Sequence, residues 1–440
     1  MSENIKLWDI IDSFISGDWG NEEESPEAPC CVSCIRGADI VPICNSDFEN
    51  IPIRYISNRS FTTHCLQEGD IIVEKSGGSP TQSTGRVVYI SKELLAAKHD
   101  IVCSNFCVAF RVKPEWNSLY IYYYLRNVYN AGVFFNFEGK TSGIKNLDIE
   151  TAFRAIPIKA IAMETQLSIA TAISCLDKKI ALNRAINDNL EAMAKQLYDY
   201  WFVQFDFPNE EGKPYKSSGG KMVWNEKLKR EIPEGWVVEK VSALIEPIER
   251  GISYASADLL DDSAMPMINL ACFSKSGDYR TGEMKYYSGI IPGNKYVQPM
   301  DMLIACTDMT QGADIIGRPI LASHEFEQYT FSTDLATLRP KSIAKMYLYY
   351  TLRTPFYHKY IRPFASGTNV KHLNIAGVEN HIITVPTDSI QLKFERTIVP
   401  VKEKQSKILN EIALLTRQLD ELLPLLMNGQ VSVNYHLSHD

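Results

Sequence analysis

This sequence has no long apolar run and no excess of positive charge. No stretch approaches about twenty uninterrupted apolar residues, the length of a membrane-spanning helix, and the opening MSENIKLWDI lacks the basic-then-apolar order of a signal peptide. The lack of a membrane-spanning run and of a signal peptide predicts a cytoplasmic protein without a membrane partner. The formal net charge of −8 disfavours a general polyanion binder, because long-range attraction toward phosphate would be unfavourable. Any contact with nucleic acid must therefore come from local patches.

Cysteine is too sparse for a disulfide framework. The ten cysteines are scattered over 440 residues, which is typical of a reducing compartment. The densest group, Cys30 to Cys44, contains a single C-x-x-C, and only the His64-Cys65 pair lies near enough to add ligands. Because a closed zinc site needs four ligands, usually as two close pairs, we interpret this group as reduced cysteines near a buried strand and predict no bound metal.

Motifs for catalysis are also missing. The chain has no Asn/Asp-Pro-Pro-aromatic methyltransferase motif, no Gly-rich nucleotide loop, and no acid pair followed by Glu-x-Lys for metal-dependent cleavage. Asp70 and Glu74 are part of a run that itself predicts a strand, and GKPYKSSGGK at 212–221 lacks the Walker spacing. The sequence therefore predicts a chain with no catalytic residues.

What the sequence does contain is an internal repeat. The stretch SGIKNLDI (142–149) matches TNVKHLNI (368–375), and LYIYYYLR (119–126) matches MYLYYTLR (346–353). Upstream, 68–90 and 299–321 each pass from an apolar run through a polar loop to Gly-Arg. Three matches in one order at a nearly constant offset indicate a duplication. Within each copy, short β-branched runs alternate with Gly, Pro, Asn and Ser clusters, which predicts an α+β domain whose tyrosine-rich segment is a helix packed on a sheet.

Each copy is followed by a segment with a heptad pattern, which predicts two long helices. The first seam is Ile169, Ile173, Leu176, Ile180, Asn183, Asn187, Leu190, Ala194, Leu197 and Trp201, and the second is Phe394, Ile398, Val401, Gln405, Ile408, Ile412, Leu415, Leu419, Leu422 and Leu426. The polar seam positions favour a partner in fixed register. Because the second helix starts where the first has delivered the chain, helices that pair must be antiparallel. Pro400 predicts a kink or a restart, since an interior proline costs about 3 kcal/mol.

The fold class is therefore predicted as α+β, with two similar domains separated by a pair of long antiparallel coiled-coil helices. The predicted boundaries are a first domain at 1–160, a first helix at 161–204, a solvated linker at 205–236, a second domain at 237–386, and a second helix with a C-terminal tail at 387–440.

This arrangement resembles the specificity subunit of type I restriction-modification systems. The resemblance covers nearly the whole chain and rests on the two domains with their helices, on LDKKIALNRAINDNLEAMAKQLYDYWF (176–202), and on FDFPN, GKPYKSSGGK and IPEGW in the linker. One departure is at the helix starts. The family usually opens them with a Pro-Pro-Leu and Glu-Gln pattern, whereas this chain has IPIKAIAMETQLS and VPTDSIQLKF.

The resemblance implies a non-catalytic subunit in which each domain is a target recognition domain for one half of a bipartite double-stranded DNA sequence. It implies two modification (methyltransferase) subunits and restriction (helicase-nuclease) subunits as partners. Those partners would methylate a flipped adenine or cleave the DNA. S-adenosylmethionine, ATP and Mg are expected on the partner subunits, and no cofactor is expected on this chain.

Residues that could contact DNA are expected on the loops of the repeat, because base edges need donors and acceptors and phosphates need cations. The candidates in the first copy are Lys75, Gly77, Gly78, Thr81, Gln82, Ser83, Arg86, Lys140, Thr141, Ser142 and Lys145. Those in the second copy are Thr307, Thr310, Gln311, Arg318, Ser366, Thr368, Asn369 and Lys371. The loops differ between the copies while the neighbouring strands match, as two different half-sites would require.

Two other functions remain open from the sequence alone. One is a coiled-coil adaptor that joins proteins without binding DNA, which the absence of net positive charge favours. The other is a stand-alone nuclease that uses Asp70 and Glu74.

Overall fold

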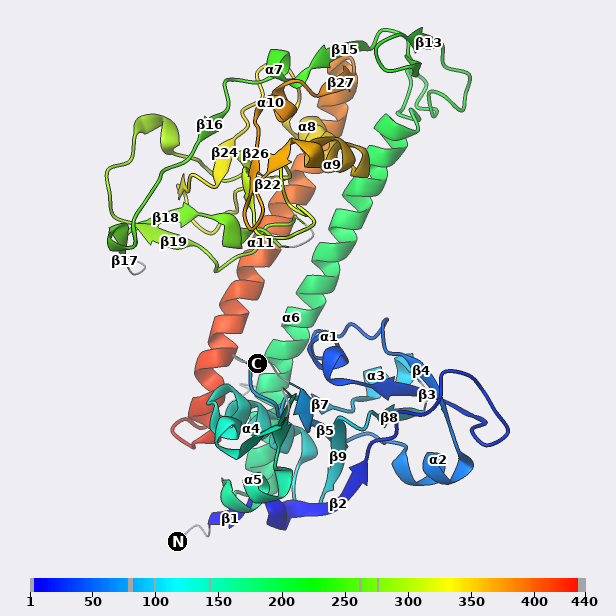
Figure 1. Ribbon diagram of the computed structural model, residues 1–440, viewed down its shortest axis with the longest axis vertical. Coiled ribbons are helices and arrows are strands. Elements are labelled where there is room, and N and C mark those ends of the chain that lie inside the picture. Colours follow the sequence, from blue (N-terminus) through cyan, green and yellow to red (C-terminus); the bar gives the residue numbers. More distant parts are fainter. Residues whose placement is uncertain are drawn as a thin grey trace, which may run out of the picture. The chain divides into compact units, whose positions relative to one another are not determined.

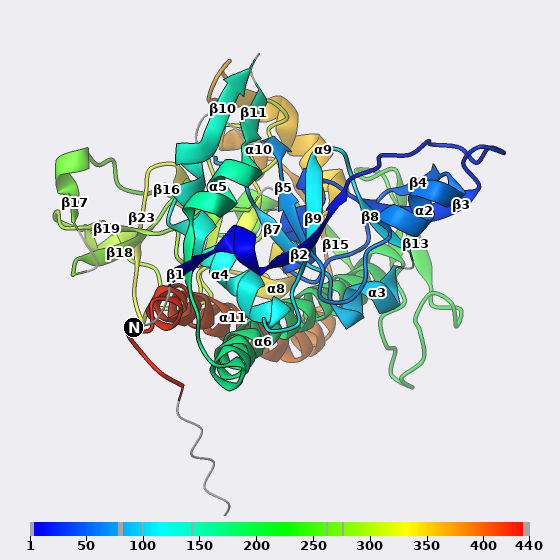
Figure 2. The ribbon, with the colours of Figure 1, turned by 90° about the horizontal axis from the view of Figure 1, so that it is seen from below.

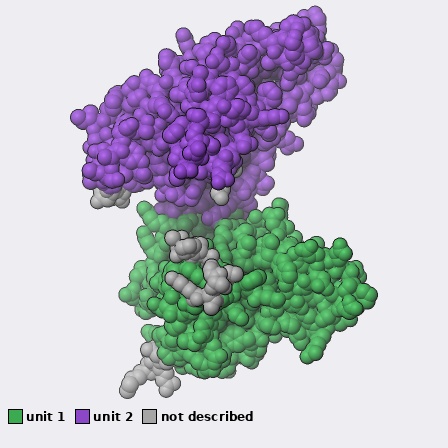
Figure 3. All heavy atoms as spheres, in the orientation of Figure 1, with its two compact units in different colours: residues 1–181, 415–440 green, residues 182–414 purple. Residues whose placement is uncertain are grey.

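The computed structural model describes residues 4–77, 82–98, 100–141, 144–260, 263–274 and 277–433. The chain divides into unit 1, residues 1–181 with 415–440, and unit 2, residues 182–414 (Figure 3). The division falls within the two longest helices, α6 (Met163–Tyr198) and α11 (Asp388–Met427). The chain is thus a mixed helix-and-strand protein. None of its described helices combines the length and apolarity needed to cross a bilayer.

Unit 1 contains the short strands and helices that precede α6, together with the first part of α6 and the last part of α11 (Figure 1). In chain order they are β1 (Asn4–Lys6), β2 (Ile11–Ser16), β3 (Cys30–Ile35), α1 (Ile40–Cys44), β4 (Ile53–Ile56), α2 (Asn58–His64), β5 (Ile71–Glu74), β6 (Ser76–Gly77), β7 (Val87–Tyr89), α3 (Lys92–Ala97), β8 (Ile101–Cys103), β9 (Cys107–Val112), α4 (Ser118–Asn130), β10 (Glu138–Thr141), β11 (Ile144–Leu147), α5 (Ile149–Ala155) and β12 (Pro157–Lys159).

Unit 2 contains the last part of α6, the first part of α11 and equally short elements between these helices in the sequence. They are β13 (Met222–Asn225), β14 (Arg230–Pro233), β15 (Val237–Lys240), α7 (Val241–Leu244), β16 (Glu249–Arg250), β17 (Leu259–Leu260), β18 (Met265–Ile268), β19 (Lys285–Tyr287), β20 (Met302–Ala305), β21 (Thr307–Asp308), β22 (Pro319–Leu321), β23 (Thr330–Phe331), β24 (Leu335–Thr337), α8 (Lys345–Thr351), α9 (Pro355–Ile361), β25 (Ala365–Ser366), β26 (Lys371–Leu373), α10 (Ala376–Glu379) and β27 (Ile382–Val385).

The two units repeat one topology, which confirms the duplication. The sheet order β2-β9-β5-β7 of unit 1 corresponds to β16-β24-β20-β22 of unit 2, and β10-β11-β6 corresponds to β25-β26-β21. The pair β1-β12 likewise corresponds to β15-β27. Each unit also has one parallel pair at the same place, β3 with β8 and β18 with β23. All four residues of each central strand, β5 and β20, are buried, as expected for a strand covered on both faces.

The tyrosine-rich helices form part of the core. Tyr122 and Tyr123 in α4 are 6% and 3% exposed, and Tyr349 and Tyr350 in α8 are 4% and 3% exposed. Their rings bury large apolar areas against the sheets. The core role expected for these aromatic residues is confirmed.

The Gly-Arg step that closes each polar loop has a packing cause. Gly85 and Gly317 adopt φ values of +99° and +67°, a conformation that favours glycine. A Cβ at Gly85 would lie 2.5 Å from Cδ2 of Phe134, and a Cβ at Gly317 would lie 2.8 Å from Cγ1 of Ile361. The repeated glycine therefore lets the strand that follows it pass close to its neighbours.

Within unit 2, α6 and α11 run antiparallel. Asn183 Nδ2 donates to Glu411 Oε2 at 2.9 Å, Gln405 Nε2 donates to the Asn187 carbonyl at 3.0 Å, and the ammonium of Lys402 contacts the Glu191 carboxylate. Residue numbers rise along one helix as they fall along the other, which confirms the predicted direction. The polar seam residues Asn183 and Gln405 are 3% and 6% exposed, so they help to fix the register of the pair.

Two details of the predicted helices differ in the structure, namely the restart at Pro400 and the strict heptad seam near the end of the second helix. Helix α11 runs through Pro400 without restarting, because Phe394 and Ile398 pack at 0% and 1% exposure and offset the cost of the proline. Near its end, Leu422 is 37% exposed and Leu423 is buried in its place. The α-helix has 3.6 residues per turn, so its buried face drifts away from a strict seven-residue repeat.

The stretch at 212–221 of the predicted linker is largely exposed, but both ends of the linker are folded into unit 2, where the expectation of a solvated connector is wrong. Phe205, Phe207 and Trp236 are buried in the core of unit 2, and Phe207 stacks on Trp236 at 5.4 Å between ring centroids. The strands β13 and β14 pair as a hairpin. Asp206 accepts hydrogen bonds from the amide and hydroxyl of Ser217. Glycine, lysine and proline mark the turns, but the aromatic residues between them provide enough apolar surface to fold.

A buried glutamine ties the start of each long helix to its own unit. Gln166 in α6 accepts from the Asn117 amide at 2.8 Å and donates to the Ile161 carbonyl at 3.0 Å. Gln391 in α11 accepts from the Ala344 amide at 2.7 Å and donates to the carbonyl five residues before it. These are the glutamines of METQLS and SIQLKF. The altered helix starts therefore keep one interaction that is identical in both copies.

Replacing either Gln166 or Gln391 with alanine should lower the free energy of unfolding by about 1–3 kcal/mol, because buried backbone groups lose their partners. The matched control is Gln196→Ala on an exposed position of α6, which should change stability by less than about 0.5 kcal/mol. Urea denaturation measures both effects. Equal stabilities for Gln166→Ala and Gln196→Ala would contradict the anchoring role.

Candidate nucleic-acid interface

In each unit, one small sheet brings together the two polar segments that were predicted separately. In unit 1, β6 pairs with β11, so that Gly77 lies opposite Lys145, and β10 completes the sheet. In unit 2, β21 pairs with β26, so that Thr307 lies opposite His372, and β25 completes the sheet. Figure 2 shows β10 and β11 side by side as a hairpin. Segments far apart in the sequence thus form one surface in each unit.

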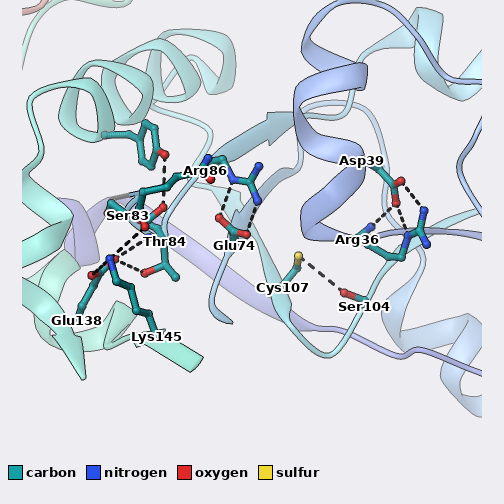
Figure 4. A network of polar contacts seen from close by, with 12 residues as sticks. Arg36, Asp39, Glu74, Ser83, Thr84, Arg86, Ser104, Cys107, Glu138 and Lys145 are labelled. Atoms are coloured by element: carbon teal, nitrogen blue, oxygen red, sulfur yellow. Dashed lines mark hydrogen bonds and ion pairs between the residues drawn. The ribbon is translucent and has the colours of Figure 1, made fainter. Parts of the chain in front are cut away.

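Arg86 is held in an ion pair inside unit 1. Its Nε and Nη2 atoms donate to the Glu74 carboxylate at 2.8 Å and 2.5 Å (Figure 4). Glu74 is 1% exposed, and a buried carboxylate needs a paired cation. The charge of Arg86 is therefore already balanced within the domain. At the position of Glu74, unit 2 has Ala305, so this pair is specific to the first copy.

Lys145 belongs to a second buried network in unit 1. Its Nζ lies 3.3 Å from Glu138 Oε2, donates to the Gln82 carbonyl at 3.1 Å and lies 4.8 Å from the ring centroid of Phe135 (Figure 4). Burial alone would raise the pKa of Glu138, but hydrogen bonds from Thr84 and Lys145 outweigh it, and the pKa of this carboxyl is lowered. Lys145 thus stabilises the packing of the polar loop against the hairpin.

The other residues predicted in unit 1 differ in exposure. Lys75 and Gln82 are exposed, whereas Ser83 is buried and donates to the Thr84 carbonyl at 2.7 Å. Lys140 and Thr141 are on β10. Three predicted positions lie outside the described residues, namely Gly78, Thr81 and Ser142.

In unit 2, the polar loop is built around Asp308, which is fully buried. Its Oδ1 accepts from the Thr310 amide and its Oδ2 from the Ile315 amide, each at 2.7 Å. Thr310 Oγ1 in turn accepts from the Asp314 amide at 3.0 Å, and Thr307 is 6% exposed. Asp308, Thr310 and Thr307 therefore shape the loop, which holds the residues at its tip in place.

The remaining predicted residues of unit 2 face outward. Gln311, Ser366, Thr368 and Asn369 are exposed, and Lys371 is half-buried with its Nζ donating to the Gly367 carbonyl at 2.6 Å. These side chains have the donors and acceptors that base edges require.

A basic pocket of about 640 Å³ adjoins this surface of unit 2 and includes the predicted Gln311, Arg318 and Lys371. Its other cationic and imidazole residues were not predicted from the sequence: Lys195, Arg353, His358, Lys359 and Arg362. Most belong to HKYIRPF at 358–364, which begins five residues after the repeated Leu-Arg at 352–353. Comparing this stretch with AGVFFNF at 131–137 of the first copy would have revealed the added cations.

The nuclease alternative is disfavoured by the pairing of its two carboxylates. Asp70 Oδ1 accepts from Arg111 Nε at 2.8 Å and is fully buried, and Glu74 is held by Arg86. Carboxylates already neutralised by arginine are poor ligands for a divalent cation. Among the described residues, no group of three or more His, Cys, Asp or Glu side chains is placed to hold a metal ion.

Residues 38–192 match the family model for the type I restriction modification DNA specificity domain. Residues 38–192 are thus similar to a type I DNA specificity domain. The matched residues include the polar loop, the β10–β11 hairpin and the first part of α6.

Relatives and a solved structure extend this likeness to nearly the whole chain. The type I restriction enzyme MjaIX specificity subunit of Methanocaldococcus jannaschii is 23% identical over 90% of this chain and 88% of its own length. The type I restriction enzyme HindI specificity subunit of Haemophilus influenzae is 24% identical over 61% of this chain and 67% of its own length. The crystal structure of a type I S subunit from M. genitalium has the same fold, with a TM-score of 0.60 and 14% identity over 97% of this chain and 96% of that chain. The family resemblance is confirmed, and with it the prediction of sequence-specific DNA recognition.

Arg86→Ala should destabilise the type I specificity domain by about 3–5 kcal/mol, because Glu74 would be left buried without a partner. Removing the charge of Glu74 as well, in Glu74→Gln/Arg86→Ala, should recover part of this loss. Chemical denaturation provides the measurement, and Arg59→Ala at an exposed position of α2 is the control. Wild-type stability of Arg86→Ala, with only DNA binding impaired, would show that Arg86 faces DNA instead.

Proposed function

We propose that this chain is the DNA-recognition subunit of a type I restriction-modification complex. Each unit acts as a target recognition domain that reads one half of a bipartite sequence in double-stranded DNA. The chain itself is not catalytic, and two modification subunits methylate an adenine in the target. Restriction subunits cleave DNA that lacks this methylation. S-adenosylmethionine, ATP and Mg are bound by those partners.

One observation carries this proposal. The three-stranded sheets β10-β11-β6 and β25-β26-β21 have the same strand order but differ in the side chains of their loops. Two domains that recognise different base sequences need the same backbone with different polar side chains on its loops. The reason is that base sequence is recognised by hydrogen bonds from side chains to base edges. An adaptor for proteins would have no need to keep this sheet twice while changing the hydrogen-bonding groups beside it.

The helices α6 and α11 set the distance between the two half-sites. Their contacts in unit 2 have a fixed register, with Asn183 opposite Glu411 and Asn187 opposite Gln405. A paired helix has a defined rise of about 1.5 Å per residue, so a pair of this kind can act as a rigid spacer between two recognition domains.

Replacing residues 1–160 with the matching domain of a relative should change one half of the methylated sequence and leave the other half intact. The junction falls between β12 and α6, so Gln166 and the helix pair are retained. Methylome sequencing of cells that express the hybrid with its partner subunits measures both halves at once. Simultaneous change in both halves, or an unchanged methylation pattern, would contradict independent reading by the two units.

Shortening both helices by one heptad should shorten the gap between the half-sites. Deleting Ala181–Asn187 together with the opposing Lys407–Ala413 removes about 10.5 Å while keeping the seams in phase. At about 3.4 Å per base pair, the gap should fall by three base pairs at most. The methylome reports this distance directly, and deletion from α6 alone should abolish activity by mismatching the seams. An active double deletion that keeps the original gap would exclude the spacer role.

A further inference from the structure

The basic pocket of unit 2 contains cations that no carboxylate neutralises. Lys359, Arg362 and Lys371 have no Asp or Glu within 4.0 Å among the described residues. Lys359 and Arg362 are exposed on α9 and in the short turn that follows it. In water, such a group of like charges is favourable only when an anion binds or solvent screens it.

Two other cations of the pocket are paired with carboxylates, and its histidine is neutral. Arg353 pairs with Asp278, and Lys195 pairs with Asp199 at 2.5 Å. His358 Nε2 lies 3.1 Å from the Ala313 carbonyl. Burial lowers the pKa of His358, so its ring is neutral near pH 7 and adds no charge to the pocket.

Arg318, which also lines the pocket, adds a further cation in a partly desolvated place. Burial and the neighbouring Arg353 lower the pKa of Arg318, while Asp278 and Asp314 partly oppose this effect. An arginine stays protonated in spite of such a shift, so positive charge gathers where water is partly excluded. An anion entering the pocket would relieve this repulsion.

Unit 1 has a pocket at the same place in the repeat, and its charge is different. That cavity of about 730 Å³ is lined by Gln82, Asn127, Asn130 and their neighbours. Where unit 2 has His358, Lys359 and Arg362, unit 1 has Ala131, Gly132 and Phe135 at an offset of 227 residues. The only charged side chain among the described residues that line it is Asp420. The duplication therefore provides an internal comparison in which the fold is kept and the cations are not.

We infer that the two units hold DNA differently: unit 2 binds phosphodiester groups of the backbone through Lys359, Arg362 and Lys371, whereas the described residues that line the matching pocket of unit 1 include no cation to do the same. This inference rests on the proposed function. DNA is favoured over an acidic protein because Gln311 and Lys371 belong both to the pocket and to the polar segments of the β25-β26-β21 surface. A phosphate in the pocket would thus be held beside the bases that this surface reads.

The asymmetry also accounts for how an acidic chain can hold DNA at all. With a net charge of −8, the chain cannot rely on its overall field, and a local cluster must provide the attraction. Each phosphate contact releases counterions and adds about 0.9 to the slope of log K against log salt concentration. The slope therefore counts the phosphate contacts, and its change in a variant of one unit shows whether that unit makes them.

The test uses the full-length chain and a fluorescent duplex of mixed sequence, titrated at several salt concentrations. Lys359→Gln/Arg362→Gln should reduce the slope by about 1.8 and weaken binding at low salt. Phe135→Arg, which adds a cation at the matching exposed position of unit 1, should raise the slope by about 0.9. The conservative pair Lys359→Arg/Arg362→Lys should keep the wild-type slope.

The control is Lys216→Gln/Lys227→Gln, which removes the same charge from exposed positions of the 205–236 segment and should leave the slope unchanged. An unchanged slope in the Lys359/Arg362 variant, an equal loss in the control, or no binding of the duplex by the wild-type chain would overturn the inference. Normal duplex binding with lost affinity for a modification subunit would overturn it too, by assigning the pocket to an acidic protein. The domain-swap methylome tests half-site reading separately, so either idea can fail alone.

Discussion

Each unit depends on the pairing of a two-residue strand with a distant hairpin. Strand β6 directly follows the buried central strand β5, and its partner β11 lies about seventy residues later; β21 and β26 repeat this arrangement in unit 2. Closing so long a loop costs conformational entropy, but the cost grows only slowly with length. The backbone groups of the short strand need partners once the loop is packed, and the hairpin supplies them. The surface that gathers the polar segments exists because of this pairing.

Buried charge decides which polar residues of that surface remain available for a ligand. In unit 1, Arg86 and Lys145 are engaged by Glu74 and Glu138, so their charges stabilise the loop. In unit 2, the loop is instead organised by Asp308, which accepts hydrogen bonds from backbone amides. A carboxylate that is satisfied by amides requires no cation. The corresponding loop of unit 2 is therefore held without an ion pair to a basic side chain. The basic side chains of unit 2 line the neighbouring pocket instead.

Buried polar residues in α6 and α11 anchor these helices and fix their register. Gln166 makes two hydrogen bonds within unit 1, and Gln391 makes the same two within unit 2, although the helix starts around them differ in sequence. Polar residues within the seam, Asn183 and Gln405, are buried and paired across it. Buried polar groups cost stability when mispaired, so they favour a single register over slipped alternatives. A fixed register is the property that a spacer between two recognition domains requires.

The sequence by itself determined the duplication, the two long helices, their antiparallel direction and the family. These features follow from the local spacing of apolar residues and from the order of the repeated motifs along the chain, neither of which depends on tertiary contacts. Only the tertiary structure decided that Arg86 and Lys145 pair with Glu74 and Glu138, that the ends of the 205–236 segment pack around Phe207 and Trp236, and that Arg362 lines the basic pocket of unit 2. Each of these depends on residues far apart in the sequence becoming neighbours. Whether a charged side chain is paired or available is a property of its surroundings, and the residue type alone does not contain it.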